Sequence, residues 1–150
     1  DDPIFETAGN MPKRIKEFCN GTGQYVPQTV GEIALCIYQS LAMKYKLTFK
    51  KLSDLTGKSY NSIHMVGGGT QAELLCQMTA NACGVNVIAG PAEATVMGNC
   101  AVQLIALGEI SDLDEARQII KNSTDLKTYI PSSADKWEEA YNNYLKIIKV

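Results

Sequence analysis

The sequence of 150 residues has a single histidine, and none of its five cysteines belongs to a C-x-x-C pair. Zinc sites are usually built from cysteines and histidines at such short spacings, so the sequence argues against a metal site. No apolar run approaches the roughly 20 residues that a membrane-spanning helix needs, and there is no signal peptide with a basic start and an apolar core. We therefore expect a soluble, cytoplasmic protein with no membrane partner.

Positive charge is also scarce. The chain has 14 Lys and Arg against 16 Asp and Glu, which gives a net charge of −2 at pH 7. Binding to nucleic acid needs a basic surface, so no nucleic-acid partner is expected. The local group Lys44, Lys46, Lys50 and Lys51 is typical of a solvated helix end.

Hydrophobic residues make up 45% of the chain, which is enough for one domain, or part of one, with a core. The sequence begins at Asp1 without an initiating methionine, so we expect a piece of a longer protein. Cys19 and Cys36 end one predicted helix and lie inside the next, so a helical hairpin could bring them together. Free thiols and a disulfide both remain open, because spacing does not give proximity.

Periodicity predicts a helix-rich α/β protein with a helical portion at 1–60 and a βαβα core plus C-terminal helices at 61–150. Two short strands flank one helix, which indicates a parallel β-α-β unit. From capping residues, glycine stops and hydrophobic spacing, the predicted helices span 11–19, 29–46, 49–55, 71–83, 94–107, 112–120 and a segment after 133, with strands at 63–66 and 85–89 and an extended stretch around 129–130.

The segment 63–71 (IHMVGGGTQ) is the most informative feature, because an apolar strand runs into three consecutive glycines and then into a helical pattern. Glycine has no Cβ, so it allows positive φ and a close approach of a ligand to the backbone. A helix opening near Thr70 would direct its free N–H groups toward a phosphate. The pattern indicates a nucleotide site at Gly67, Gly68 and Gly69, with a strand-to-helix turn without a ligand as the open alternative.

Two known types of glycine-rich nucleotide-binding loop can be compared with this segment. A P-loop needs a lysine after its last glycine, and Thr70 follows here, so that loop is excluded. Gly67, Gly69 and Ala72 fit the dinucleotide pattern G-x-G-x-x-A, which also needs an acid at the end of the next strand. That strand ends in Gly-Pro and Glu93 lies beyond it, so a Rossmann-like module is disfavoured but open.

A wider resemblance rests on five segments, namely 1–5 (DDPIF), 9–12 (GNMP), 63–71, 82–84 (ACG) and 87–94 (VIAGPAEA). With these residues the chain resembles, over nearly its whole length, the C-terminal lobe of the FGGY family of sugar kinases. The resemblance implies part of an actin-like, ribonuclease-H-like ATPase lobe with a short parallel sheet, and ATP bound between two lobes.

The resemblance also implies roles for individual residues. Gly68 and Gly69 match nucleotide-contacting glycines, Gly67 shapes the turn, and Gln71 lies close by. Family members usually carry asparagine after that glutamine, whereas this chain has Ala72, which removes one side-chain partner for the nucleotide. A turn after the second strand approaches the nucleotide in the family, and its matching residues here are Glu93 and Thr95.

The activity implied is transfer of the γ-phosphoryl group of MgATP to the 1-hydroxyl of L-rhamnulose, in L-rhamnose degradation. In proteins of the family, the catalytic base and the sugar-binding residues lie in regions that this chain does not include. No catalytic residue is therefore assigned here, and the chain alone is expected to be inactive. An uncovered strand edge would favour a homodimer. Another kinase of the family, such as L-fuculokinase, and the Rossmann-like module are the alternatives.

Overall fold

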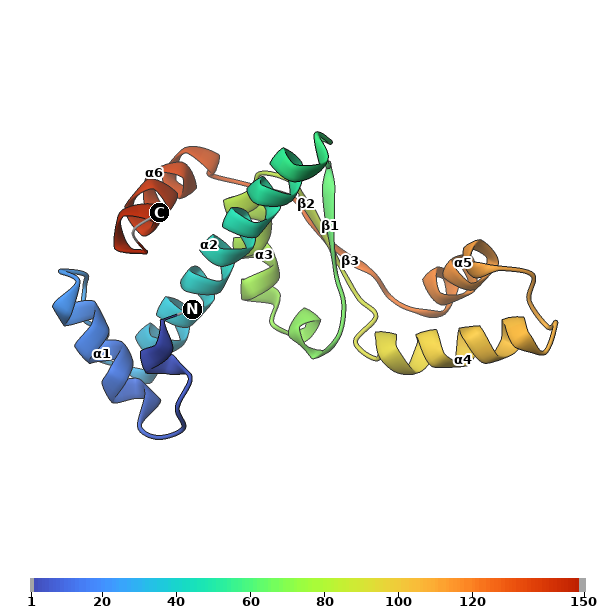
Figure 1. Ribbon diagram of the computed structural model, residues 1–150, viewed down its shortest axis with the longest axis horizontal. Coiled ribbons are helices and arrows are strands. Elements are labelled where there is room, and N and C mark those ends of the chain that lie inside the picture. Colours follow the sequence, from blue (N-terminus) through green and yellow to red (C-terminus); the bar gives the residue numbers. More distant parts are fainter. Residues whose placement is uncertain (1, 149–150) are drawn as a thin grey trace.

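A computed structural model describes residues 2–148, in which a small mixed sheet lies between one group of helices and a pair of helices that extends away from it (Figure 1). The helix-rich α/β class is confirmed. In chain order the elements are the 3₁₀ helix η1 (Pro3–Phe5), α1 (Met11–Gly21), α2 (Val30–Thr56), β1 (Ser62–Met65), the 3₁₀ helix η2 (Gly68–Gln71), α3 (Glu73–Cys83), β2 (Asn86–Ala89), α4 (Ala94–Ala106), α5 (Leu113–Ser123), β3 (Lys127–Tyr129) and α6 (Ala134–Ile147).

Helix α2 begins where its capping box predicts, because the Thr29 side chain accepts from the Glu32 N–H and the Glu32 carboxylate accepts from the Thr29 N–H. The predicted break between two helical stretches near Leu47 is wrong. No glycine or proline lies between Glu32 and Thr56, and the Thr48 hydroxyl donates to the Lys44 carbonyl at 3.0 Å instead of interrupting the helix. The helix ends at Gly57, whose φ is +64°.

The sheet has the order β1-β2-β3. Strands β1 and β2 are parallel, with Ile63 opposite Val87, which confirms the β-α-β unit. The predicted short parallel sheet is extended by one strand, because β3 pairs antiparallel to β2 with Val87 opposite Tyr129. Only an extended stretch was predicted there, since three residues are too few to show the alternation of a strand.

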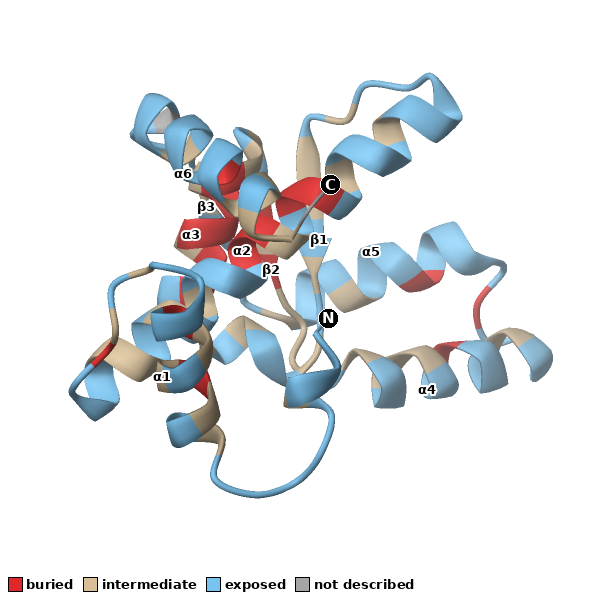
Figure 2. Cartoon of the chain, turned by 60° about the vertical axis from the view of Figure 1, so that its left-hand side comes forward, coloured by how far each residue is buried: buried red, intermediate tan, exposed pale blue. Residues whose placement is uncertain are grey.

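The core lies around α3, as the buried segments in Figure 2 show. One side of α3 covers the sheet, and the other side contacts α2 through the cluster Ala42, Met78 and Ala82. The cluster between α3 and the sheet contains Cys76, Ala80, Val87 and Ala89, flanked by Ile63, Met65 and Tyr129. This packing fixes the segment between β1 and α3, which carries the three glycines, at the carboxyl ends of the parallel strands.

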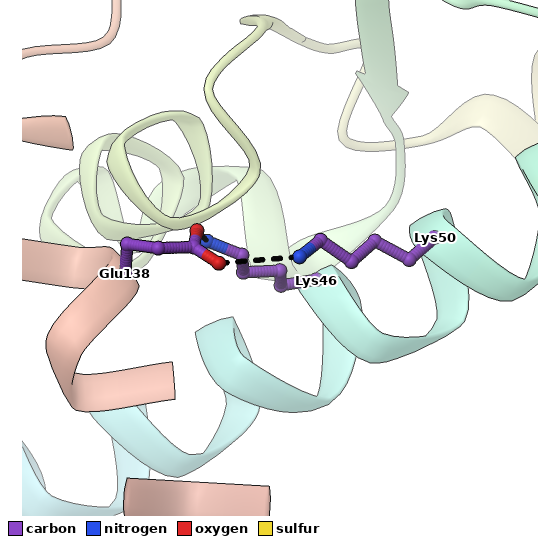
Figure 3. Close-up of polar contacts among 3 residues, drawn as sticks. All are labelled: Lys46, Lys50 and Glu138. Atoms are coloured by element: carbon purple, nitrogen blue, oxygen red, sulfur yellow. Dashed lines mark hydrogen bonds and ion pairs between the residues drawn. The ribbon is translucent and has the colours of Figure 1, made fainter. Parts of the chain in front are cut away.

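Helix α6 packs against α2 through aromatic side chains, with Tyr141 buried beside Met43 and Leu47. A polar contact joins the same two helices (Figure 3). Lys46, only 5% exposed, donates to the carboxylate of Glu138, and the Lys50 ammonium lies 3.3 Å from the other oxygen of that carboxylate. The α6 helix is therefore held by both an apolar contact and a shared charge.

The hairpin of α1 and α2 brings Cys19 and Cys36 together, and both thiols are free. Burial, and then the side-chain hydrogen bond and charge of Cys36, raise the pKa of Cys19 to about 11. A thiol with a raised pKa is a poor nucleophile at neutral pH. Among residues 2–148, no helix combines the length and the apolar character that crossing a membrane requires.

Candidate functional site

The three glycines form a turn whose shape depends on Gly67. This residue has φ +84° and ψ −175°, a backbone conformation that is essentially restricted to glycine. Its N–H donates to the Pro91 carbonyl at 3.0 Å, which ties the turn to the segment after β2. The Thr70 hydroxyl donates to the Gly67 carbonyl at 2.8 Å and closes the turn from the other side.

The helix after the glycines begins later than the sequence predicts, because a short 3₁₀ helix precedes it. The sequence predicts a helix from about Thr70, whereas the chain first forms η2 over 68–71 and α3 then begins at Glu73. Gly68 and Gly69 are the first residues of η2, and the first N–H groups of a helix have no acceptor within it. These groups are available to a ligand.

The space beside the glycine loop is open, which is what a phosphate needs in order to reach the backbone. A Cβ placed on Gly67, Gly68 or Gly69 would meet no atom within 4 Å. Gly68, Gly69 and Gln71 are exposed, so the loop presents its backbone and the Gln71 side chain to solvent. The predicted nucleotide-binding residues therefore lie together, and they fit a ligand that is held mainly by backbone groups.

Ala72, the position at which the resemblance leads us to expect asparagine, occupies the N-cap of α3. Its φ and ψ are −84° and 79°, and it provides no side-chain hydrogen bond to the helix. Asn10 has nearly the same backbone angles, −76° and 79°, and its side chain accepts from the Lys13 N–H at 3.1 Å. The backbone at position 72 is thus already suited to a capping side chain.

We expect Ala72→Asn to stabilise the chain by about 1 kcal/mol, the usual effect of replacing alanine at an N-cap. The amide oxygen would accept from the N–H of Leu75, as Asn10 does in α1. Urea unfolding of the 150-residue chain measures the effect, and Ala72→Leu is the control because leucine offers no acceptor. Equal midpoints for both variants would contradict this account of the cap.

A cavity of about 330 Å³ lies next to the glycine loop. Thr70 borders it on the loop side, and Glu93 borders it on the turn after β2. The predicted Thr95 is exposed on α4 and does not line the cavity. The full lining is Thr70, Ala89, Gly90, Pro91, Ala92, Glu93, Met97, Thr124, Asp125 and Lys127.

Asp125 and Lys127 were not predicted from the sequence. They follow α5, far along the chain from the glycines, and reach the cavity because β3 pairs with β2. The Lys127 ammonium lies 2.5 Å from the Glu73 carboxylate in the first turn of α3. The hydrogen bond and charge of Lys127 lower the pKa of Glu73, and those of Glu73 raise the pKa of Lys127.

Within residues 2–148, no three His, Cys, Asp or Glu side chains are grouped so that they could hold a metal ion. No residue of this part of the chain is therefore assigned to Mg²⁺. The described residues place the exposed backbone of Gly68 and Gly69 next to a cavity, and none of their side chains is assigned as a catalytic base.

Comparison with known proteins gives a consistent picture. The C-terminal domain of the FGGY family of carbohydrate kinases matches residues 1–107. The rhamnulokinase of Bacteroides thetaiotaomicron is 40% identical over 149 residues, which are 99% of this chain and 31% of that protein. The rhamnulokinases of Bacillus subtilis and Ligilactobacillus salivarius are 41% and 38% identical, over 91% and 99% of this chain and 28% and 30% of their own lengths. The chain thus spans about three tenths of the length of these relatives.

Proposed function

The chain belongs to the FGGY family of carbohydrate kinases, and from this premise we propose that it is part of the nucleotide-binding C-terminal lobe of an ATP-dependent sugar kinase. The single observation that supports the nucleotide role best is the open glycine loop, because its backbone faces free space at all three glycines. Family membership favours this function over a Rossmann-like dinucleotide module.

In this proposal, bound ATP supplies the phosphoryl group that is transferred to the sugar. The residues that hold it here are Gly68 and Gly69, through their backbone, with Gly67 setting the turn and Gln71 next to the ligand. Transfer of a phosphoryl group depends mainly on positioning and on neutralising charge, so a rigid loop with free N–H groups contributes by orienting the nucleotide. MgATP is the expected form of the substrate.

The finer proposal is transfer to the 1-hydroxyl of L-rhamnulose, which would give L-rhamnulose 1-phosphate in the cytoplasmic degradation of L-rhamnose. It is supported by the names of the relatives, each of which is a rhamnulokinase. The sugar and the catalytic base would be held by residues outside this chain, so we propose that the chain alone does not phosphorylate a sugar. Another sugar of the same family, such as L-fuculose, is the competing substrate.

A coupled ADP-release assay on the full-length gene product tests this proposal. L-rhamnulose, L-fuculose and L-xylulose are offered separately with MgATP, and we expect ADP release to be fastest with L-rhamnulose. A preference for another ketose would keep the kinase and change its substrate. The kinase proposal is wrong if none of the three sugars increases ADP release above the rate with MgATP alone.

A further inference from the structure

Three polar residues of α3 contact the segment 127–132, which we call the strap. Glu73, Gln77 and Asn81 are spaced by four residues, so they form one stripe along the helix. Their partners on the strap follow in the same order, namely Lys127, Ile130 and Ser132. The strap therefore runs along α3 and is bound to it at three successive turns.

The contacts at the far end of this stripe converge on one oxygen atom. Asn81 Oδ1 accepts from the Ser132 N–H at 2.8 Å, from the Ser132 hydroxyl at 3.3 Å and from Gln77 Nε2 at 2.9 Å. The same Gln77 amide donates to the Ile130 carbonyl at 2.8 Å. Both amide side chains are half-buried, where a lost hydrogen bond costs more than at an open surface. Asn81 is thus the residue that holds the end of the strap.

The strap connects two sides of the molecule. Strand β3 lies in the stretch that leads from α5, on one side of the sheet, to α6, on the other side (Figure 1). Ser133, the residue after the strap, has φ +61°, a left-handed conformation that serine rarely adopts. The hydrogen bonds from Ser132 to Asn81 fix the point at which the chain makes this turn. The strap lies beyond residues 1–107, the range that the family domain matches.

The other end of the strap contacts the first turn of α3, which has few other contacts. Ala72 provides no side-chain cap, Leu74 is 50% exposed, and the buried residues of α3 begin at Leu75. The Glu73 carboxylate lies 2.5 Å from the Lys127 ammonium. An exposed ion pair is weak by itself, so its geometry depends on how the strap is held farther along α3.

Hydrogen bonds join α3 to the glycine loop. The thiol of Cys76, which is fully buried, donates to the Thr70 carbonyl of η2 at 3.8 Å, and the Cys76 N–H donates to the Ala72 carbonyl at 3.1 Å. Gly68 and Gly69 directly precede Thr70 in η2. A shift of the first turn of α3 would therefore also shift the N–H groups that are proposed to hold the nucleotide.

We propose that Asn81 is a positioning residue for the nucleotide, because it holds the strap along α3 and the strap holds the first turn of α3 through Lys127 and Glu73. Asn81 does not itself touch the nucleotide. Its effect reaches the glycine loop through the position of α3 relative to β3. This inference rests on the proposed nucleotide-binding function.

Titration of the full-length gene product with ADP tests the inference. Asn81→Leu removes the acceptor with little change in size, and it should weaken ADP binding by about fivefold, within the range for mutations that act through a network of contacts. Asn81→Asp keeps an oxygen at the same position and should bind ADP like the wild-type protein. Residue 81 is about 12 Å along α3 from Glu73, so salt at physiological ionic strength screens the new charge from the loop.

Glu138→Ala is the control for a general loss of stability. It removes the contact between α6 and α2 and leaves the hydrogen bonds of the strap in place. It should destabilise the fold and still bind ADP with wild-type affinity, at a temperature at which circular dichroism shows every variant to be folded. Gln77→Leu is the second variant and decides the question if Asn81→Leu does not fold. It removes the donor to the Ile130 carbonyl and should also weaken ADP binding.

The outcomes separate the two claims. The positioning inference is overturned, and the nucleotide function stands, if the wild-type protein and the leucine variants bind ADP equally well. It is also overturned if Glu138→Ala loses as much affinity as Asn81→Leu, or if Asn81→Asp binds as weakly as Asn81→Leu. If the wild-type protein does not bind ADP at all, the proposed function fails and the positioning inference fails with it.

Discussion

Replacing Glu138 by alanine is expected to lower the free energy of unfolding of the chain by about 3 kcal/mol, because it leaves a buried lysine without its counter-charge. Lys46 is only 5% exposed and donates to Glu138, whereas Glu138 itself is half exposed (Figure 3). Lys50 pairs with the same carboxylate, so the Glu138→Ala substitution also leaves the positive charges of Lys46 and Lys50 near each other. Alanine is a good helix former, which removes helix propensity as a cause.

Urea unfolding of the 150-residue chain at pH 7 measures this effect. Glu139→Ala is the matched control, because Glu139 is the next residue on α6 and is exposed. The control should change the free energy of unfolding by less than about 0.5 kcal/mol, as is usual for surface positions. Similar losses in both variants would show that the contact between Lys46 and Glu138 does not stabilise α6 on α2.

The same contact predicts a pH dependence. The hydrogen bond from Lys46 and the charges of Lys46 and Lys50 lower the pKa of Glu138 from its ordinary value of 4.5. The folded chain therefore holds this carboxyl proton less tightly than the unfolded chain. The stabilisation is present in full above pH 4.5 and is lost as the pH falls through the lowered pKa. The difference in the free energy of unfolding between the wild-type chain and Glu138→Ala should shrink as the pH falls below 4.5. A difference that does not change with pH would contradict the assignment of the effect to the charge of Glu138.

Replacing Gly68 by valine is expected to weaken ADP binding by at least about tenfold, because binding through the backbone requires a close approach that a side chain prevents. Gly68 has no positive φ, and a Cβ there meets no atom within 4 Å, so the chain itself tolerates the change. Gly67 is unsuitable for this experiment, since its φ of +84° would strain any other residue.

Gly31→Val is the control for the valine substitution. Gly31 lies in the first turn of α2, and a Cβ there also meets no atom within 4 Å. Both variants should unfold at nearly the wild-type urea concentration, and only Gly68→Val should lose affinity for ADP. An equal loss in both would indicate a general effect of the substitution.

Local signals predicted most of the helices correctly. Asn10 and the Thr29 capping box start α1 and α2 as expected, because a cap depends only on residues within one turn. The glycine loop was predicted for the same reason, since three consecutive glycines after a strand are a local feature of the sequence. The false break near Leu47 shows the limit of hydrophobic spacing, because a long helix can turn its apolar face gradually from one neighbour to another.

Features that depend on the pairing of β3 were not predicted, whereas the parallel pairing of β1 and β2 was. Strand β3 has three residues, and it is defined by the pairing of Val87 with Tyr129 rather than by a pattern of its own. The part of the cavity lining that was not predicted results from the same pairing, which brings Asp125 and Lys127 beside the turn that carries Glu93. No periodicity or spacing in the sequence connects these positions.

Calorimetric titration of the wild-type full-length gene product and of its Gly68→Val variant with ADP measures whether the glycine loop holds the nucleotide. We expect saturable binding of ADP to the wild-type protein and an affinity lower by at least about tenfold in the variant. Absence of ADP binding by the wild-type protein, or equal affinities in the two proteins, would contradict the assignment of the nucleotide site to the glycine loop.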